Sequence, residues 1–331
     1  MFEWSIAVKT RFRLPINSTV DIASIFNRQL SNTSVLSLGE GAPSGYIDVI
    51  HLSNIKLFSI NVNQPLAIYA DRTSGTLLFS INLAKSSESN YIKAQGVELT
   101  RTALFGFNYN LKDLDLFLPS GSKMCCIGIS ADWFHKKLDQ LKISSAHDLL
   151  DKFNVLANSL VSQKLTQLLN QCWDSSLISS QDYLEDEIIS LLFECLVDRS
   201  DRKVARPIKR QDRHEAALKI LGTAYAMPTK AFEIQDLSDM LHQSRTSLFN
   251  GCRDKFGMSP IQVVRSVRLH QVHHALLDVE FCIKHNISGV VDAAEFFGFV
   301  GRSHFSKHYK YEFNETPRQT LSRRRKAERV F

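Results

Sequence analysis

The chain has 331 residues, of which 44% are hydrophobic and 22% are charged, a composition typical of a globular protein with ample core-forming residues. No stretch is long and apolar enough to span a bilayer, and the first residues lack the basic and then apolar pattern of a secretion signal. We therefore predict a cytoplasmic protein without a membrane partner, and the length favours two domains.

Charge is divided unevenly along the chain. Residues 201–331 carry 23 Lys and Arg against 14 Asp and Glu, a net charge of +9, whereas the remainder carries 17 against 20, a net charge of −3. A basic module next to a mildly acidic one is the pattern expected when only one domain meets the phosphates of DNA.

Residues 1 to about 142 are predicted to be rich in β-strands. Apolar or alternating runs of strand length are separated by turn-forming Gly, Pro and Ser residues: Ile47–Ile50, Ile55–Val62, Leu66–Ala70, Thr76–Leu83, Leu111–Leu118 and Met124–Ile129. No helical periodicity separates these runs, so we expect a barrel or a sandwich. His51 stands without a metal-ligand pattern and is interpreted as a surface or strand residue.

From Ser130 onward the apolar periodicity becomes helical. Amphipathic helices are predicted over Ala131–Leu141, Ala146–Cys172 and Ser180–Asp198. Their apolar faces either pack against the strands or form a dimer interface, and the sequence does not distinguish these alternatives. Together with the strands they make up a domain of residues 1–200, in which residues 146–200 are the candidate dimerisation region.

The six cysteines lie at positions 125, 126, 172, 195, 252 and 282 and show no Cys-x-x-Cys or Cys/His metal spacing. Cys125 and Cys126 are adjacent in an apolar run and are expected to point to opposite sides of a strand. Reduced, mostly buried thiols are therefore preferred to disulfides or a metal site.

Two basic segments flank the last third of the chain. Residues 201–213 are polar, basic and interrupted by Pro207, and we predict a solvated linker there. Residues 322–331 contain the run Arg323-Arg324-Arg325-Lys326, predicted to be a basic tail that adds salt-dependent, non-specific affinity for DNA.

Between these segments, residues 214–321 contain an internal repeat. An apolar residue in every fourth position, followed by a Ser-Pro or Thr-Pro pair, recurs 57 positions later: Leu248, Cys252, Phe256 and Ser259-Pro260 become Phe305, Tyr309, Phe313 and Thr316-Pro317. Residues four apart share one stripe of a helix, so each copy is predicted to be the second helix of a helix-turn-helix with a buried seam. The opposite faces are polar and basic, which suits a DNA major groove.

Each predicted recognition helix has a supporting helix before it and stop signals after it. Supporting helices are predicted around Ile234–Leu241 and Val291–Phe299, and Ser244 is positioned to cap the first recognition helix. Gly257 and Asn314 tolerate the left-handed conformation that closes a helix.

One long helix is predicted to connect the two copies. Pro260–Leu277 is an uninterrupted run of helix formers that begins with a proline, a residue tolerated at a helix start. Such a helix is roughly 27 Å long. It could hold two recognition helices about one DNA turn, ~34 Å, apart.

This double helix-turn-helix resembles the DNA-binding domain of the AraC/XylS-type transcription regulators. The resemblance covers roughly residues 216–321, about a third of the chain, and rests on the pattern Gly298-Phe299…Ser303-His304-Phe305-Ser306…Tyr309-Lys310…Phe313…Pro317. It implies an N-terminal sensor domain, often cupin-like, so the predicted fold class is α+β, with an all-α domain over residues 214–321. It also implies recruitment of RNA polymerase, mostly activation, and a small-molecule effector or a partner acting on the N-terminal domain.

The resemblance also assigns contact residues. Positions that match the base contacts of the family are Thr246, Phe249, Asn250, Arg302, Ser303, Ser306 and Lys307. Those expected to grip phosphate are Arg245, Arg253 and Lys310. Three residues depart from the family pattern: Gly251 is a poor helix former, Cys252 replaces a large aromatic residue, and Phe249 replaces a polar one, either to touch a thymine methyl group or to pack.

Catalytic and metal-binding alternatives find little support. His270 and His274, four positions apart on the connecting helix, could hold zinc, but no third ligand accompanies them, so a structural or phosphate-facing role is preferred. There is no Gly-rich phosphate loop, nucleophile elbow or spaced carboxylate pair. Certain DNA-repair methyl acceptors carry a similar DNA-binding unit, but their Pro-Cys-His setting is missing. We predict no enzyme activity, no cofactor and no metal.

The predicted function is that of a bacterial, sequence-specific DNA-binding transcription regulator that acts as an activator. Its predicted partners are double-stranded DNA, RNA polymerase, a small-molecule effector and a second copy of the chain. Two alternatives stay open. A non-specific architectural DNA-binding protein would show little dependence of affinity on sequence, and a helical protein-interaction module would show no salt-dependent DNA binding.

Overall fold

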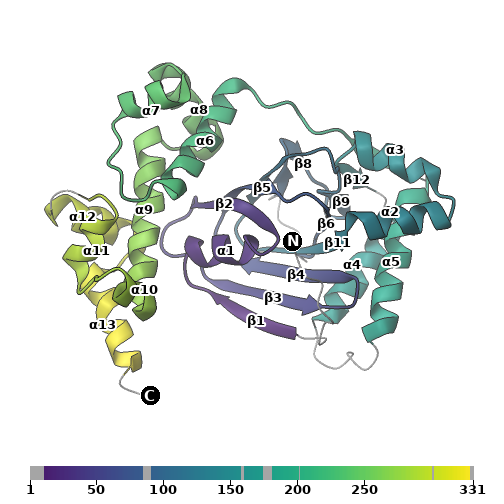
Figure 1. Cartoon of the computed structure of the whole chain (residues 1–331), viewed down its shortest axis with the longest axis horizontal. Coiled ribbons are helices and arrows are strands. Elements are labelled where there is room, and N and C mark those ends of the chain that lie inside the picture. Colours follow the sequence, from purple (N-terminus) through teal and green to yellow (C-terminus); the bar gives the residue numbers. More distant parts are fainter. Residues whose placement is uncertain are drawn as a thin grey trace. The chain divides into compact units, whose positions relative to one another are not determined.

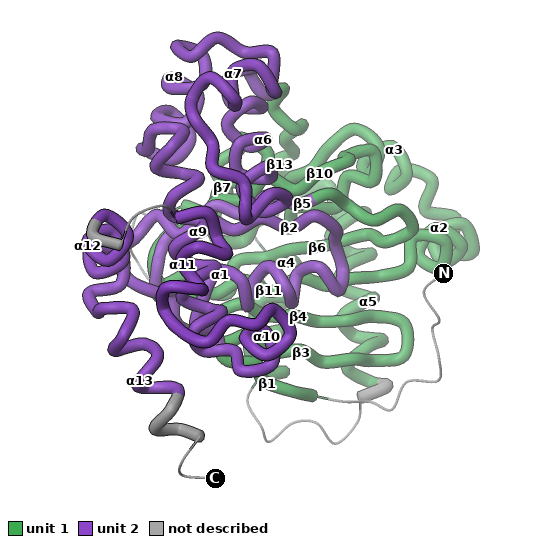
Figure 2. Tube along the Cα trace, turned by 60° about the vertical axis from the view of Figure 1, so that its left-hand side comes forward, with its two compact units in different colours: residues 1–15, 45–63, 71–209 green, residues 16–44, 64–70, 210–331 purple. Residues whose placement is uncertain are grey.

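The computed structural model describes residues 11–84, 91–157, 160–173, 181–200, 202–299 and 302–328. Within these ranges the side chains of residues 181, 182, 302, 303 and 325–328 are not described. The chain divides into two compact units, which Figure 2 shows in green and purple. Unit 1 comprises residues 1–15, 45–63 and 71–209, and unit 2 comprises residues 16–44, 64–70 and 210–331.

Unit 1 is built on a β-sheet, as the alternating apolar runs predict (Figure 1). Its strand order is β1 (Arg11–Ile16), β3 (Gly45–His51), β4 (Ile55–Val62), β11 (Ser122–Ser130), β6 (Thr76–Asn82), β9 (Ala103–Phe105), β12 (Val155–Ala157) and β13 (Lys203–Ala205). Three further strands pair antiparallel with one another: β10 (Asp113–Leu118), β7 (Lys93–Ala94) and β8 (Val97–Glu98). The β-rich N-terminal part and the α+β class are confirmed.

Four helices cover the core of unit 1: α2 (Ala131–Gln140), α3 (Ser144–Lys152), α4 (Val161–Cys172) and α5 (Gln181–Val197). Phe134 of α2 lies 5.2 Å from Phe79 of the sheet and 5.0 Å from Phe193 of α5, measured between ring centroids. The apolar side chains of α4 and α5 belong to this intramolecular core. Of the two alternatives for these faces, packing against the strands is the one that the structure shows.

Two predictions about helices are wrong. The single helix predicted over residues 146–172 is divided, because Val155–Ala157 pairs with β9 on one side and β13 on the other. The N-terminal part also contains a helix, α1 (Thr19–Phe26), among its strands. Its start is visible in the sequence, since the Ser18 hydroxyl accepts a hydrogen bond from the backbone N–H of Asp21, a usual N-cap arrangement.

Unit 2 contains the two predicted helix-turn-helix motifs. Its helices are α6 (Asp212–Ala226), α7 (Ile234–Leu241), α8 (Arg245–Phe256), α9 (Pro260–Leu277), α10 (Val279–Lys284), α11 (Val290–Phe296), α12 (Arg302–Phe313) and α13 (Pro317–Glu328). The connecting helix α9 has the predicted bounds. Unit 2 also includes α1 and two neighbouring strands, β2 (Leu30–Ser37) and β5 (Leu66–Arg72), the latter through residue 70.

This grouping differs from the domains predicted from the sequence. Residues 16–44 and 64–70 lie within the segment predicted as one N-terminal domain, residues 1–200, yet they cluster with the C-terminal helices. Within the segment predicted as a linker, residues 201–213, Lys203–Ala205 form β13 and helix α6 begins at Asp212. No helix in the described part of the chain is long and apolar enough to cross a membrane.

Local signals set the helix ends, and those at Ser244, Gly257 and Asn314 are as predicted. Ser244 caps α8 by accepting a hydrogen bond from the N–H of Ser247, and Gly257 ends it with a φ of 70°. Ser259 and Gln262 form a reciprocal capping box around the start of α9. Asn314 closes α12 with a φ of 57°.

The repeated apolar seams are buried. Leu248, Cys252 and Phe256 belong to one core cluster of unit 2, and the residues that replace them in the second copy, Phe305, Tyr309 and Phe313, belong to another. Each helix-turn-helix thus has its own core, joined to the other by α9, which contributes residues to both clusters.

Gly251 is required by the close approach of α6 to α8. A Cβ atom at this position would lie 2.0 Å from the carbonyl oxygen of Arg213. Real Cβ contacts are never that short, so any side chain would push α6 away from the recognition helix. Packing therefore requires glycine at position 251, despite its poor helix propensity.

Gly251→Ala is expected to destabilise unit 2 by about 1–3 kcal/mol, because the overlap outweighs the gain in helix propensity of about 1 kcal/mol. Gly222→Ala, in α6, is the matched control, since its Cβ would meet nothing within 4 Å. That variant should be neutral or more stable. Urea unfolding measures both, and equal behaviour of the two variants would contradict the packing explanation.

All six cysteines are free and buried. Burial raises the pKa of the thiols of Cys126, Cys172, Cys195 and Cys252 to about 12. Cys125 packs in the apolar core of unit 1, while the Cys126 sulfur lies 3.0 Å from the Ser80 hydroxyl, consistent with opposite faces of β11.

These four thiols are expected to resist alkylation in the folded protein. A thiol with a pKa of 12 is ionised to roughly one part in ten thousand at pH 8, and only the thiolate reacts. Labelling with iodoacetamide, followed by peptide mass spectrometry, should proceed about three orders of magnitude more slowly than in urea-unfolded protein. Rapid native labelling of any of the four would contradict this assignment.

Candidate nucleic-acid interface

Helix α8 presents the predicted contact residues on its exposed face. With its apolar seam buried, Thr246, Asn250 and Arg253 are left exposed, and 45% of the Phe249 surface is accessible. Arg245 is also exposed, and its Nε donates to the side-chain oxygen of Gln235 on α7 at 2.9 Å. The structure thus brings all five predicted residues of the first copy onto one helix surface.

Helix α12 presents the second set. Ser306, Lys307 and Lys310 are exposed, while the side chains of Arg302 and Ser303 lie outside the described residues. Sequence reasoning missed His304 and Tyr311, which are also exposed on this helix, Tyr311 to 77%. Their helical positions relative to the buried Phe305 and Tyr309 would have revealed them.

The surroundings of α12 are electropositive. Partial burial lowers the pKa of His308, and the nearby cations Arg265 and Lys307 lower it further. The pKa of His308 is therefore below the usual value for histidine, although this residue lies on a recognition helix. The same positive potential attracts a phosphate backbone.

Each recognition helix carries a single acidic residue, and both acids contact a neighbouring helix. Asp254 of α8 forms an ion pair with Arg213 at 3.1 Å and lies 3.6 Å from Nε2 of His214. Glu312 of α12 accepts a hydrogen bond from the Ser266 hydroxyl at 2.8 Å and lies 3.3 Å from Nε2 of His270. Burial opposes ionisation of Glu312, but these contacts hold its pKa below the ordinary value. Both carboxylates are thus held by neighbouring helices, and Asp254 is paired with the charge of Arg213.

The histidines of α9 pair with carboxylates rather than with one another. Nε2 of His270 approaches Glu312, Nε2 of His273 lies 3.5 Å from Glu315, and Nε2 of His274 lies 3.3 Å from Asp21. Burial lowers the pKa of His273 to about 3, so this imidazole is neutral. Among the described residues no group of three or more His, Cys, Asp or Glu side chains could hold a metal ion. These contacts fit the structural role preferred for His270 and His274 in the sequence analysis.

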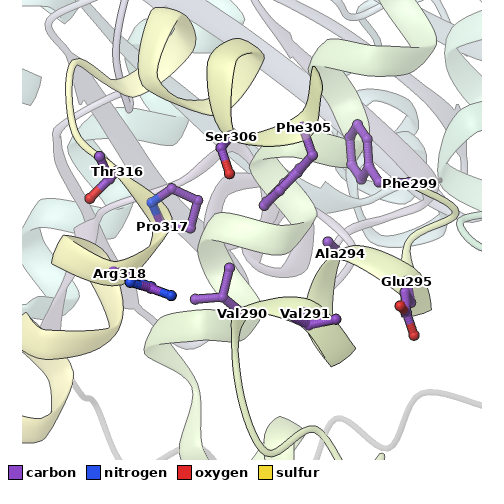
Figure 3. A pocket seen from close by; sticks show the side chains of 10 residues that line it. All are labelled: Val290, Val291, Ala294, Glu295, Phe299, Phe305, Ser306, Thr316, Pro317 and Arg318. Atoms are coloured by element: carbon purple, nitrogen blue, oxygen red, sulfur yellow. The ribbon is translucent and has the colours of Figure 1, made fainter. Parts of the chain in front are cut away.

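A cavity of about 340 Å³ lies between α11, α12 and α13. Figure 3 shows Val290, Phe305 and Ser306 turned toward this common space, with Arg318 beside it. Its lining is mostly apolar. Because Ser306 also belongs to the predicted base-contacting set, this cavity adjoins the second contact surface.

Comparison with known proteins identifies the same region. A family model described as a helix-turn-helix domain matches residues 237–323. The regulatory protein HrpB of Ralstonia nicotianae is 40% identical over 67 residues, which are 20% of this chain and 13% of that protein. The chain thus matches only about an eighth of the length of this relative.

Solved structures with detectable similarity include regulators of one family. A probable AraC family transcriptional regulator from Rhodopseudomonas palustris has 26% identity, a TM-score of 0.30, and coverage of 33% of this chain and 97% of its own. The AraC-like transcriptional activator CuxR has 13% identity, a TM-score of 0.39, and coverage of 80% and 96%. ToxT from Vibrio cholerae has 16% identity, a TM-score of 0.30, and coverage of 89% and 98%.

Phe249 and its neighbour Leu248 provide a test of which face of α8 is outward. Phe249→Ser is expected to change the free energy of unfolding by less than about 0.5 kcal/mol, as for most surface substitutions. Leu248→Ala, which empties a fully buried position, should cost about 2–5 kcal/mol. Urea unfolding compares the two. A loss for Phe249→Ser as large as that for Leu248→Ala would remove Phe249 from the contact surface.

Proposed function

We propose that this chain, whose C-terminal region is an AraC-type helix-turn-helix domain, is a sequence-specific DNA-binding regulator that activates transcription in a bacterial cytoplasm. One observation supports this proposal above the others. Two recognition helices flank one connecting helix, each exposes polar and basic residues, and the single carboxylate of each is held by a neighbouring helix, Asp254 by Arg213 of α6 and Glu312 by Ser266 of α9. This is the surface that two adjacent major grooves require.

Readout would be divided between the two helices. Asn250 on α8 has the donor and acceptor needed for a bidentate contact with adenine, and Thr246 and Phe249 can meet a thymine methyl group. On α12, Lys307 suits the acceptors of guanine, with Arg302, Ser303 and Ser306 as its neighbours in the base-contacting set. Arg245, Arg253 and Lys310 would hold phosphates and fix the register.

The N-terminal part is proposed to regulate this activity. A small-molecule effector of that part, contact with RNA polymerase and association of two copies belong to the proposal and rest on the resemblance to AraC-type regulators. Because the apolar faces of α4 and α5 are buried inside unit 1, a dimer would have to use their outer faces or another surface.

Selection of binding sites from random duplexes by the full-length protein is the first test. A preferred sequence is expected, with an affinity that falls steeply as salt rises. Asn250→Ala should then cost about 1–3 kcal/mol on the selected site and relax the preference at one position. Fluorescence anisotropy titrations measure both effects.

Lys310→Ala should behave differently from Asn250→Ala. Loss of a phosphate contact is expected to weaken binding to selected and unrelated duplexes alike, and to reduce the slope of log affinity against log salt by about 1. Lys136→Ala, an exposed lysine of α2, makes the same charge change in unit 1 and should leave both quantities unaltered.

Two outcomes would overturn the proposal. Affinity without any sequence preference would favour an architectural DNA-binding protein. Absence of salt-dependent DNA binding would favour a protein-interaction module.

A further inference from the structure

The segment from residue 16 to residue 44, hereafter the bridging segment, contains α1, β2 and the loop that follows. It belongs to unit 2, although almost 170 residues of the sequence separate it from α6. It contributes apolar side chains to both helix-turn-helix cores. Leu36 is buried in the cluster that contains Leu248, and Ala42 packs against the cluster that contains Phe305.

The bridging segment is hydrogen-bonded to the first helix-turn-helix through α6. The hydroxyl of Tyr225 donates to the carbonyl oxygen of Val35 in β2 at 2.7 Å. Burial raises the pKa of this hydroxyl to about 12, so it remains a donor throughout the physiological range. Helix α6 is the same helix whose backbone contacts Gly251 of the recognition helix.

A second contact joins the bridging segment to the connecting helix. Nε2 of His274 lies 3.3 Å from Asp21 of α1. The carboxylate of Asp21 also accepts from the backbone N–H of Asn17 at 2.8 Å. Burial opposes ionisation of Asp21, but His274 and Asn17 together hold its pKa below the ordinary value. The contact is therefore made by a charged carboxylate.

A third contact reaches the second recognition helix. The backbone N–H of Gly41 donates to the carbonyl oxygen of Glu312, in the last turn of α12, at 2.5 Å. Val35 and Gly41 are six residues apart, and six residues span at most roughly 20 Å. The same short stretch is thus bound to α6, which packs against the first recognition helix, and to α12, the second recognition helix.

We propose that the bridging segment is a positioning element that fixes the two recognition helices relative to each other. It would thereby set the separation of the two half-sites that the protein reads. This inference rests on the proposed function, because spacing has meaning only for a protein that binds two grooves. Helix α9 joins the motifs along one line, and the bridging segment ties them together at a second place, which resists bending and twisting about that line.

The test compares two double variants of the full-length protein. Asp21→Asn with Tyr225→Phe removes the carboxylate that contacts His274 and a hydroxyl contact of the bridging segment. Asp48→Asn with Tyr46→Phe removes the same kinds of groups in unit 1, where Asp48 pairs with Arg13 at 2.7 Å and the Tyr46 hydroxyl accepts from Asn61 at 3.2 Å. Affinity is measured for the selected site, for the same site with one or two base pairs inserted or deleted between its halves, and for each half alone.

The bridging variant is expected to bind the selected site about tenfold more weakly while losing much less affinity for the altered spacings. Its affinity for a single half-site should stay within about twofold of wild type, which a general loss of folding would not allow. The control variant should keep the wild-type spacing profile. A second variant, with four Gly and Ser residues inserted after Glu40, lengthens the connection without removing any contacting side chain and should flatten the profile in the same way.

An unchanged spacing profile in both bridging variants would overturn the inference. So would equal losses on the selected site and on single half-sites. If wild-type protein selects no bipartite sequence, the proposed function itself fails, and that result is distinct from failure of the bridging segment.

Discussion

Burial of the connecting helix is the constraint on which unit 2 depends. Helix α9 contributes to the cores of both motifs, and most of its polar middle, including Ser266, Arg268, His270 and His273, is buried as well. Buried polar groups are costly unless they find partners. The Ser266 hydroxyl donates to Glu312, and Nε2 of His270 and of His273 lie 3.3 Å from Glu312 and 3.5 Å from Glu315, so carboxylates of the second motif lie against the buried polar side of α9.

Arg268 shows how α9 also contacts the first motif through a polar side chain. Its guanidinium lies over the ring of Phe232, 5.5 Å from the centroid, and close to the turn at Gly298. Burial lowers its pKa, and its Nε and one terminal nitrogen have no hydrogen-bond partner among the described residues. Arg268 thus contacts the segment before α7 in the first motif and the turn after α11 in the second. Helix α9 thus contacts both motifs through polar as well as apolar side chains.

Sequence reasoning succeeded where a pattern is local and failed where the partner is distant. The bounds of α7 and α9 follow from caps, a proline and apolar spacing, and the buried seams follow from the repeat. The strand at Val155–Ala157 could not be distinguished from helix, because its identity comes from pairing with β9 and β13. The contact-face residues could be placed because helical periodicity defines the outward side once the seam is known. The bridging segment could not be predicted, since its contacts with Tyr225, His274 and Glu312 have no signature in the order of residues.

The fit of Gly251 against Arg213 limits how such proteins can change their target. Exchange of a whole recognition helix between relatives would be one way to change the DNA sequence that a regulator binds. Here Gly251, on the buried side of α8, packs directly against the main chain of α6. A recognition helix taken from a relative with any larger residue at this position could not keep the same orientation. New target preferences would therefore have to arise by altering outward residues one at a time, with the glycine retained, or by replacing both helices together.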